Sequence, residues 1–466
     1  MTFDAIIIGA GQAGPSLAGR LTAAGWKVAL VERKLFGGTC VNTGCMPTKT
    51  LVASAYAAHL ARRAADYGVV LRGEVAVDMK AVKERQQTVV RNARGNVETW
   101  LRGMDGLTVV EGHARLTSPT TVEVDGRVLA APKIFLNVGG RANVPDMPGV
   151  NDVPYLTNVG MMQLDVLPEH LVIVGGSYIG LEFAQMYRRF GAAVTVVEMG
   201  PRLIGREDPE VSDTVREILE AEGVAFRLNS ECISFAPNKT ERGEEGVCVN
   251  VTCREGEPAV KGSHVLLAVG RKPNTDDLGL EVAGVALDKR GYIQVDETLR
   301  TNVPSIWAMG DCNGRGAFTH TAYNDFEIIA ANLLDDDPRR VTDRLTAYAL
   351  YIDPPLGRVG MTEAEVRGSG RPALVGTRPM TRVGRAVEKG ETQGFMKVLV
   401  DAETRQILGA SILGVSGDEA IHGILDVMYA KAPYTILQRT VPIHPTVSEL
   451  IPTVLGELKP LAQGAA

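Results

Sequence analysis

Two cysteines five positions apart are the residues in this sequence best suited to redox chemistry. Cys40 and Cys45 follow a glycine pair, and Pro47 comes two residues after the second cysteine. Because proline is favoured in the first turn of a helix, we expect Cys45 to lie at a helix N-terminus. The backbone N–H groups there favour a thiolate, as does Lys49, one turn further on. This setting predicts a reactive cysteine pair.

The alternatives are two buried, reduced cysteines or half of a metal site. A structural zinc site needs four ligands, and no further Cys or His residues cluster near this stretch. Cys248 and Cys253 have the same spacing, but their run has the pattern of a strand. There the side chains would point to opposite faces, roughly 17 Å apart and beyond disulfide reach. The spacing alone is therefore not the signal; the glycine-rich loop and the helix start are.

The composition limits the classes of protein that need to be considered. A chain of 466 residues is too long for one hydrophobic core and suggests two to four domains. Its net charge is −6 without a basic stripe, so we expect no nucleic-acid partner. No apolar run approaches a membrane span, so we expect no membrane partner. The N-terminus lacks the pattern of a signal peptide, and six cysteines then favour a reducing compartment, so we expect a cytoplasmic protein.

A dinucleotide-binding fingerprint lies at the start of the chain. Residues 4–8 have the pattern of a buried strand, and G-x-G-x-x-G follows at Gly9, Gly11 and Gly14, before a helix and a second strand that ends at Glu32. The glycines allow a tight turn, close approach of a pyrophosphate and close helix–strand packing. The carboxylate of Glu32 can accept hydrogen bonds from a ribose. The complete unit makes a plain glycine-rich turn the weaker alternative.

The same unit recurs in the middle of the chain, which predicts a second bound dinucleotide. A strand begins at Leu171, a turn and a helix follow, and the next strand ends at Glu198. Ser177 replaces the second glycine, which costs little if the phosphate shifts slightly. The carboxylate of Glu198 can bind the 2′-hydroxyl of NADH and would repel the 2′-phosphate of NADPH, although Arg202 and Arg206 could soften this preference. We expect NADH rather than NADPH.

Further motifs make the chain resemble the class I pyridine nucleotide-disulfide oxidoreductases, which include dihydrolipoamide dehydrogenase, glutathione reductase and mercuric reductase. The resemblance covers essentially the whole chain. Besides the cysteine stretch and the two fingerprints, the similar segments are Val138-Gly139-Gly140-Arg141, Val269-Gly270-Arg271-Lys272-Pro273-Asn274, Thr301 to Asp311, Thr319-His320-Thr321-Ala322 and Pro442 to Glu449.

The resemblance implies an α/β fold with two doubly wound, Rossmann-like dinucleotide-binding domains and a C-terminal α+β interface domain for dimerisation. Residues 1–149 and 270–340 would form a discontinuous FAD-binding domain that carries the redox disulfide. Residues 150–269 would form the NAD(P)-binding domain, and residues 341–466 the interface domain.

The resemblance also implies roles for the cysteines and for an ion pair. Cys40 and Cys45 would form a redox-active disulfide, with Cys45 nearest the flavin and Cys40 facing the substrate. Lys49 would pair with Glu182 beside the flavin. For Glu182 taken alone, the alternative is a solvated acid on a helix.

The last motif implies a catalytic histidine. His444 would be the acid–base catalyst, held by Glu449, and would reach the disulfide of the other subunit in a homodimer. His444 and Pro445 are candidates for a cis bond, because X-Pro is the one class where cis is cheap. A histidine that is merely satisfied at an interface is the alternative.

The same resemblance assigns cofactor-binding residues, and no metal site is expected. Asp311 would bind the ribityl hydroxyls of FAD, and Tyr178 would be the ring that covers the flavin until the nicotinamide displaces it; a packed aromatic is the alternative for Tyr178. The full set is Gly9, Gly11, Gly14, Glu32, Arg33, Gly38, Thr39, Lys49, Gly112, Ala114, Asp311, Thr319, Gly175, Ser177, Tyr178, Ile179, Gly180, Glu198, Gly270 and Arg271.

The implied reaction passes electrons from NADH through FAD and the disulfide to a small or protein-bound disulfide or dithiol. We favour a dihydrolipoamide-type substrate, since glutathione-type substrates usually go with arginines in place of Glu198. The cysteine stretch looks most like that of mercuric reductase, but residues 455–466 contain no cysteine pair of the kind those enzymes carry. Metal-ion reduction is therefore an alternative, as are an oxidase or quinone reductase with a bystander disulfide and a nucleotide-binding regulatory protein without turnover.

Overall fold

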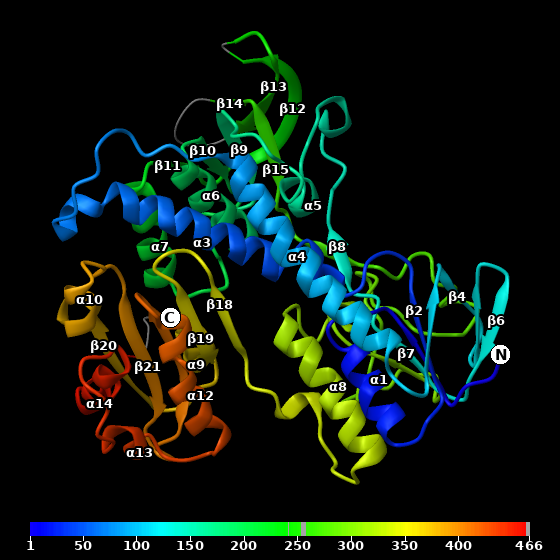
Figure 1. The fold of residues 1–466 in the computed structure, drawn as a ribbon. Coiled ribbons are helices and arrows are strands. Elements are labelled where there is room, and N and C mark those ends of the chain that lie inside the picture. Colours follow the sequence, from blue (N-terminus) through cyan, green and yellow to red (C-terminus); the bar gives the residue numbers. More distant parts are fainter. Residues whose placement is uncertain (241, 253–257, 463–466) are drawn as a thin grey trace.

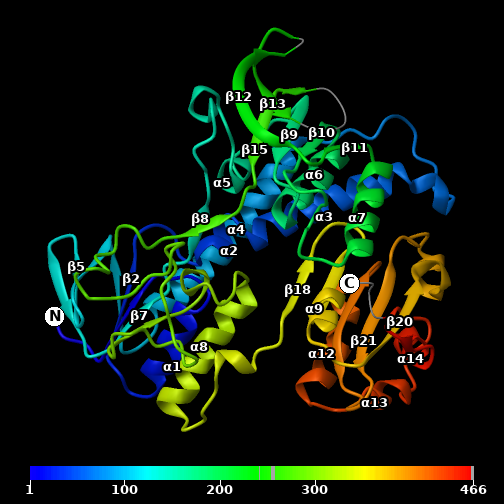
Figure 2. The same ribbon diagram turned by 180° about the vertical axis from the view of Figure 1, so that it is seen from behind.

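The computed structural model describes residues 1–240, 242–252 and 258–462. It confirms the predicted α/β class, with two parallel sheets and a C-terminal antiparallel sheet. The three sheets form the centres of three regions, with the N-terminus in the first region (Figures 1 and 2). Among the residues described, no helix is long and apolar enough to cross a membrane.

The first region is built on a five-stranded parallel sheet in the order β17-β7-β1-β2-β3. Alternate residues of its central strand face opposite layers: Ile7 packs toward the helices and Ile6 toward a small antiparallel sheet. Because β17 joins this sheet after the whole second region, the first region is discontinuous in sequence. Its elements are β1 (Ala5–Ile8), β2 (Val28–Glu32), β3 (Leu107–Glu111), β7 (Ile134–Leu136), β17 (Ile306–Ala308), helices α1 (Gly14–Ala23) and α8 (Thr319–Leu334), and the small sheet β4 (Ala114–Ser118), β5 (Thr121–Val124) and β6 (Arg127–Ala130).

The second region repeats this plan with a four-stranded parallel sheet in the order β11-β10-β9-β15. A three-stranded antiparallel sheet again covers one face. Its elements are β9 (His170–Val174), β10 (Ala193–Val197), β11 (Val224–Arg227), β15 (His264–Leu267), α6 (Tyr178–Phe190), α7 (Pro209–Ala221), β12 (Glu231–Lys239), β13 (Glu245–Thr252) and β14 (Ala259–Gly262). Cys248 lies in β13, in the run with the pattern of a strand, and Cys253 lies outside the described residues.

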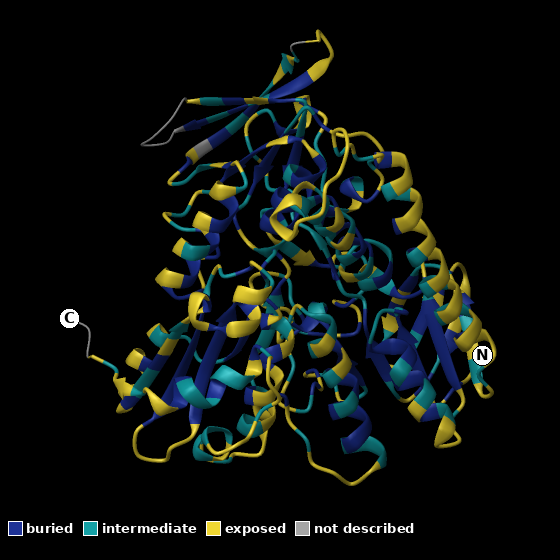
Figure 3. Cartoon of the chain, turned by 60° about the vertical axis from the view of Figure 1, so that its left-hand side comes forward, coloured by how far each residue is buried: buried dark blue, intermediate teal, exposed yellow. Residues whose placement is uncertain are grey.

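The third region contains a six-stranded sheet whose two central strands are buried along their whole length (Figure 3). The helical segments near 416–431 and 446–457 are each broken into shorter helices. Ile421 separates α11 from α12, and in the second segment α14 begins at Ile451 with Pro452 in its first turn. The elements are β18 (Ala347–Leu350), β19 (Leu356–Gly360), β20 (Ala373–Pro379), β21 (Phe395–Asp401), β22 (Ile407–Leu413), β23 (Lys459–Pro460), α9 (Glu363–Gly368), α10 (Gly384–Glu388), α11 (Gly417–Ala420), α12 (His422–Tyr429), α13 (Thr435–Gln438) and α14 (Ile451–Gly456).

Helix α3 (Cys45–Arg62) joins the first region to the second. It follows the short helix α2 (Gly38–Asn42) and packs against α6 and against the long helix α4 (Met79–Arg102) (Figure 1). The first turns of α3 therefore lie where the first and second regions meet.

Candidate active site

The cysteine stretch is fixed to the first fingerprint loop. Cys40 lies in α2, and Cys45 is the first residue of α3. Gly38 has a φ of +61°, and a Cβ there would lie 2.9 Å from the Cα of Gly11. A side chain would push the two loops apart, so glycine is required for the pair to sit against the fingerprint.

The two thiols have opposite acidities. A hydrogen bond from Cys40, together with Thr319 and the charge of Lys49, lowers the pKa of Cys45 to about 6, against the effect of burial. The same hydrogen bond and burial raise the pKa of Cys40. The Thr319 Oγ1 lies 3.2 Å from the Cys45 Sγ, at the first residue of α8. A single negative charge on the pair therefore belongs on Cys45.

An ion pair lies one turn into α3. The Lys49 Nζ donates to both Glu182 oxygens at 2.7 and 2.9 Å, and the Glu182 side chain is only 7% exposed. The backbone N–H of Tyr351 donates to the same carboxylate at 3.0 Å, and Lys49 lies 4.5 Å from the centre of the Tyr351 ring. Sequence reasoning missed Tyr351, because neither spacing nor a motif links it to Lys49.

The first fingerprint has the shape that a dinucleotide pyrophosphate needs. Gly9 has a φ of +108°, and a Cβ there would lie 2.3 Å from the backbone oxygen of Asn137. Glu32 accepts the backbone N–H groups of Ala10 at 2.9 Å and Lys34 at 2.8 Å, and each oxygen keeps a lone pair for a ribose hydroxyl. These residues therefore fit FAD. Asn137 was not predicted, since it lies 128 residues from Gly9 in the chain.

Further predicted FAD-binding residues lie in the segments that follow β2 and β3 of the first sheet. Arg33 donates to Asp277 at 2.7 Å, and His113, which follows Gly112 and precedes Ala114, also contacts Asp277. Thr39 is exposed between Gly38 and Cys40 in α2.

The flavin motif contacts the segment that comes after the second region. Asp311 follows Gly310, shortly after the end of β17 at Ala308, and lies 3.3 Å from the Arg271 Nη2. Arg271 also donates to the Gly140 oxygen at 2.7 Å. The structure thus places Arg271, and Gly270 beside it, against the first region.

The second fingerprint repeats the geometry of the first. Gly175 has a φ of +112°, with the Ala268 oxygen 2.5 Å from the position of a Cβ. Glu198 accepts the backbone N–H groups of Gly176 at 2.6 Å and Gly200 at 2.7 Å. Ser177 is exposed, Ile179 is half-buried and Gly180 is buried in the first turn of α6.

Tyr178 is the first residue of α6 and lies one turn before Glu182. Its hydroxyl donates to Glu207 at 3.1 Å, and its ring meets the Tyr348 ring edge-on with the centres 5.5 Å apart. The Tyr178 ring therefore packs between the start of α6 and β18 of the third region.

His444 and Glu449 form a pair on the surface of the third region. The His444 Nδ1 lies 2.8 Å from the Glu449 Oε2, and because a carboxylate only accepts, Nδ1 donates. The His444 side chain is 79% exposed, and no hydrogen bond within the described part of the chain joins it to either cysteine. Apolar side chains are exposed beside it, Val441 by 97% and Ile443 by 80%, as expected of a surface that a partner covers.

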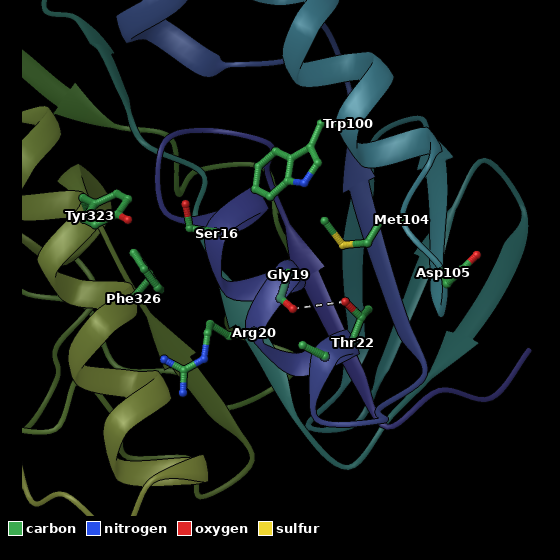
Figure 4. A pocket seen from close by; sticks show the side chains of 10 residues that line it. Ser16, Gly19, Arg20, Thr22, Trp100, Met104, Asp105, Tyr323 and Phe326 are labelled. Atoms are coloured by element: carbon green, nitrogen blue, oxygen red, sulfur yellow. Dashed lines mark hydrogen bonds between the residues drawn. The ribbon is translucent and has the colours of Figure 1, made fainter.

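A hollow of about 620 Å³ lies elsewhere, on the outer side of the first region between α1, α4 and α8 (Figure 4). Trp100 and Phe326 line it together with Arg20, which pairs with Asp335. Its lining contains none of the predicted site residues.

Most of the chain matches one protein family. Residues 3–325 match the family described as "Pyridine nucleotide-disulphide oxidoreductase", and residues 346–455 match the dimerisation domain of the same family. The chain therefore belongs to the pyridine nucleotide-disulfide oxidoreductases, enzymes that use FAD and a pyridine nucleotide. The second match supports a homodimer.

Three relatives within this family align with nearly the whole chain. The chain is 36% identical to the "Probable pyridine nucleotide-disulfide oxidoreductase RclA" of Escherichia coli (strain K12), over 98% of this chain and 99% of the relative. It is 33% identical to a mercuric reductase of Streptomyces lividans, over 96% and 94% of the two chains. A dihydrolipoyl dehydrogenase of Chlamydia muridarum is 31% identical over 96% and 95%.

A solved structure agrees with this comparison. The "Cu(II) complex of HOCl-induced flavoprotein disulfide reductase RclA from Escherichia coli" superposes with a TM-score of 0.88 at 35% identity, covering 98% of this chain and 99% of the other. The chain is thus an oxidoreductase of the flavoprotein disulfide reductase type.

Proposed function

We propose that this enzyme uses NADH, through FAD, to reduce a disulfide between Cys40 and Cys45, and that this pair then reduces a thiol-reactive acceptor. The observation that carries the proposal is the position of Cys45 at the start of α3, in contact with Thr319 and one turn from the Lys49–Glu182 pair. FAD, when bound, supplies the exchange between a hydride from NADH and an electron pair for the disulfide.

We assign residues 1–149 and 270–340 to FAD, residues 150–269 to the nicotinamide dinucleotide and residues 341–466 to the dimer interface. The geometry of the first fingerprint, of Glu32 and of Asp311 supports the first assignment. Glu198, with its carboxylate beside the second fingerprint loop, supports NADH over NADPH.

The opposite acidities of the two thiols suit the proposed chemistry. An electron pair and one proton convert the disulfide to a Cys45 thiolate and a Cys40 thiol, which matches the lowered pKa of Cys45 and the raised pKa of Cys40. Cys40 must lose its proton before it attacks a substrate disulfide. His444 from the second copy of the chain, with Nε2 available while Nδ1 is held by Glu449, is the base we assign to this step.

A dihydrolipoamide-type disulfide is our first candidate for the acceptor, because the His444–Glu449 pair can exchange protons with a dithiol. Cu(II) is the second candidate, and the Cu(II) complex of the E. coli relative favours it. The reduced pair would give one electron to each of two Cu(II) ions, forming two Cu(I) ions, reforming the disulfide and releasing the one proton held by Cys40. In the described part of the chain no group of three or more His, Cys, Asp or Glu side chains could hold a metal ion, so copper would be a passing substrate at the two sulfurs.

A panel of acceptors tests the proposal. NADH oxidation is measured with lipoamide, oxidised glutathione, Cu(II), Hg(II) and a quinone, and is repeated with NADPH and with Cys40→Ala. We expect lipoamide or Cu(II) to support turnover with NADH in the wild-type protein only. Equal turnover of the quinone by both proteins, with no turnover of any other acceptor, would contradict the proposal and identify a quinone reductase with a bystander cysteine pair.

A further inference from the structure

Two tyrosines share one oxygen of a buried carboxylate. The hydroxyls of Tyr178 and Tyr348 donate to the Glu207 Oε1 at 3.1 and 2.5 Å, and the Glu207 side chain is 0% exposed. The three residues come from different places: Tyr178 begins α6, Glu207 precedes α7 and Tyr348 lies in β18 of the third region. Glu207 thus ties the second fingerprint to the third region.

The other oxygen of Glu207 accepts no hydrogen bond from the residues that the structure describes. Its nearest cation is Arg358, whose Nη1 lies 3.7 Å away and donates instead to Asp208 at 3.2 Å. A buried carboxylate with so few partners binds its remaining donors tightly, since losing one leaves charge uncompensated. The two phenols are therefore the main hydrogen-bonding partners of Glu207.

Tyr178 is the less restrained of the two tyrosines. Both tyrosines are half-buried, whereas Glu207 and Arg358 are buried. The Tyr348 ring is held from its other side by the Phe318 ring, which is stacked at 5.6 Å with an angle of 15° between the planes. If Tyr178 moves away, Tyr348 stays and keeps the Glu207 carboxylate hydrogen-bonded.

We propose that Glu207 is a latch that holds the Tyr178 ring over the nicotinamide position, and that NADH must break the Tyr178–Glu207 hydrogen bond to bind. The inference rests on the proposed function, in which the second fingerprint binds NADH. Glu207 is a positioning residue here, because it acts through Tyr178. Only molecules in which the Tyr178 ring has moved away can bind the nucleotide. The apparent affinity is therefore the intrinsic affinity multiplied by the fraction of such molecules.

The phenol remains a hydrogen-bond donor over the whole physiological pH range. Burial, together with the charge of Glu207, raises the pKa of Tyr178. The latch is therefore opened by the nucleotide and not by a change in pH.

Equilibrium binding tests the latch without turnover. The dissociation constants of NAD⁺ and NADH are measured by calorimetry for the wild-type protein, Tyr178→Phe, Glu207→Gln and the double variant. We expect Tyr178→Phe to bind the nucleotide roughly 10- to 100-fold more tightly, because NADH no longer has to break a hydrogen bond to a charged group. Glu207→Gln should change affinity in the same direction, and the double variant should bind no more tightly than Tyr178→Phe.

Tyr348→Phe is the matched control. It removes the other phenol from the same oxygen but leaves the Tyr178 bond in place, so its affinity should not rise. An equal gain in Tyr348→Phe, or additive gains in the double variant, would overturn the latch.

The outcomes separate the latch from the proposed function. Nucleotide binding by the wild-type protein with unchanged or weaker binding by Tyr178→Phe would overturn the latch alone. Absence of any NADH or NAD⁺ binding by the wild-type protein would overturn the proposed function. If Glu207→Gln fails to fold, Tyr178→Phe and its control decide the question, because neither removes a buried charge.

Discussion

The two dinucleotide-binding units of this chain share a scaffold and differ in the segments attached to it. A Cβ at Gly14 would lie 2.2 Å from the Gly9 oxygen, and one at Gly180 would lie 2.1 Å from the Gly175 oxygen. In both units a glutamate at the end of the second strand accepts a backbone N–H from the glycine loop. The loop geometry therefore specifies dinucleotide binding as a class but not its chemistry.

The chemistry comes from these attached segments. After Glu32 the first unit continues directly into the cysteine pair and α3. In the second unit the helix begins two motif positions earlier, at Tyr178, and presents Glu182 toward Lys49 of α3 and Tyr178 toward Glu207. Under the proposed function, one unit carries the electron acceptor and the other carries the groups that admit the electron donor.

Replacing Cys45 in the first unit should have the largest effect on turnover. We expect Cys45→Ser to lower NADH-dependent disulfide reduction by roughly 10³-fold or more while NADH still binds. Cys248→Ser, a cysteine of the second region in β13, is the matched control and should leave turnover unchanged. Steady-state rates with lipoamide are measured for both variants. Similar losses of turnover in Cys45→Ser and Cys248→Ser would contradict the proposed difference between the two units.

Removing the base should lower the same reaction without disturbing the second unit. We expect His444→Gln to reduce disulfide turnover by roughly 10²-fold or more. The dissociation constant of NADH should not change. Coexpression with Cys45→Ser should restore activity in mixed dimers, because one site then combines an intact cysteine pair with an intact histidine. No restoration would show that the histidine acts within its own chain.

The two ribose glutamates should affect different nucleotides. Loss of a hydrogen bond to a charged group costs about 1.5–3 kcal/mol, or roughly 10- to 100-fold in affinity. We expect Glu32→Ala to weaken FAD retention and Glu198→Ala to weaken NADH binding, each by about this factor. Flavin content and NADH titration measure the two effects. Weaker NADH binding in flavin-saturated Glu32→Ala, with normal binding in Glu198→Ala, would reverse our assignment of the units.

The acidity of Cys45 predicts a pH profile that Cys40 does not share. Because its pKa is lowered from 9.0 to about 6, Cys45 is a thiolate above pH 6 and becomes protonated below it. The rate of its alkylation in the reduced protein should therefore fall about tenfold per pH unit below pH 6. Mass spectrometry of iodoacetamide-treated protein measures this rate. Lys49→Met should move the midpoint to higher pH, and a midpoint near 9 in the wild-type protein would contradict the assignment.

The sequence was most informative where a function depends on local geometry. Pro47 after Cys45 predicted a helix start, and two glycine motifs between strands predicted the two units, because these patterns act within a few residues. The ion pair of Lys49 and Glu182 could be expected only through the resemblance to the family, because its partners lie 133 residues apart.

Contacts between segments that are distant in the chain were not predictable. The contacts of Tyr351, Asn137 and Glu207 join residues far apart in the sequence. Neither periodicity nor motif spacing predicts such contacts. Apolar periodicity also does not register the short breaks between α11 and α12 and before α14 in the third region.

The most direct test of the account is an anaerobic reductive titration that counts electrons. FAD and the Cys40–Cys45 disulfide are each a two-electron centre, so the oxidised wild-type protein should take up two electron pairs per chain. Cys45→Ser, with the same flavin content, should take up one pair. Uptake of a single pair by the wild-type protein, or of two pairs by both proteins, would contradict the claim that the first unit passes electrons to these two sulfurs.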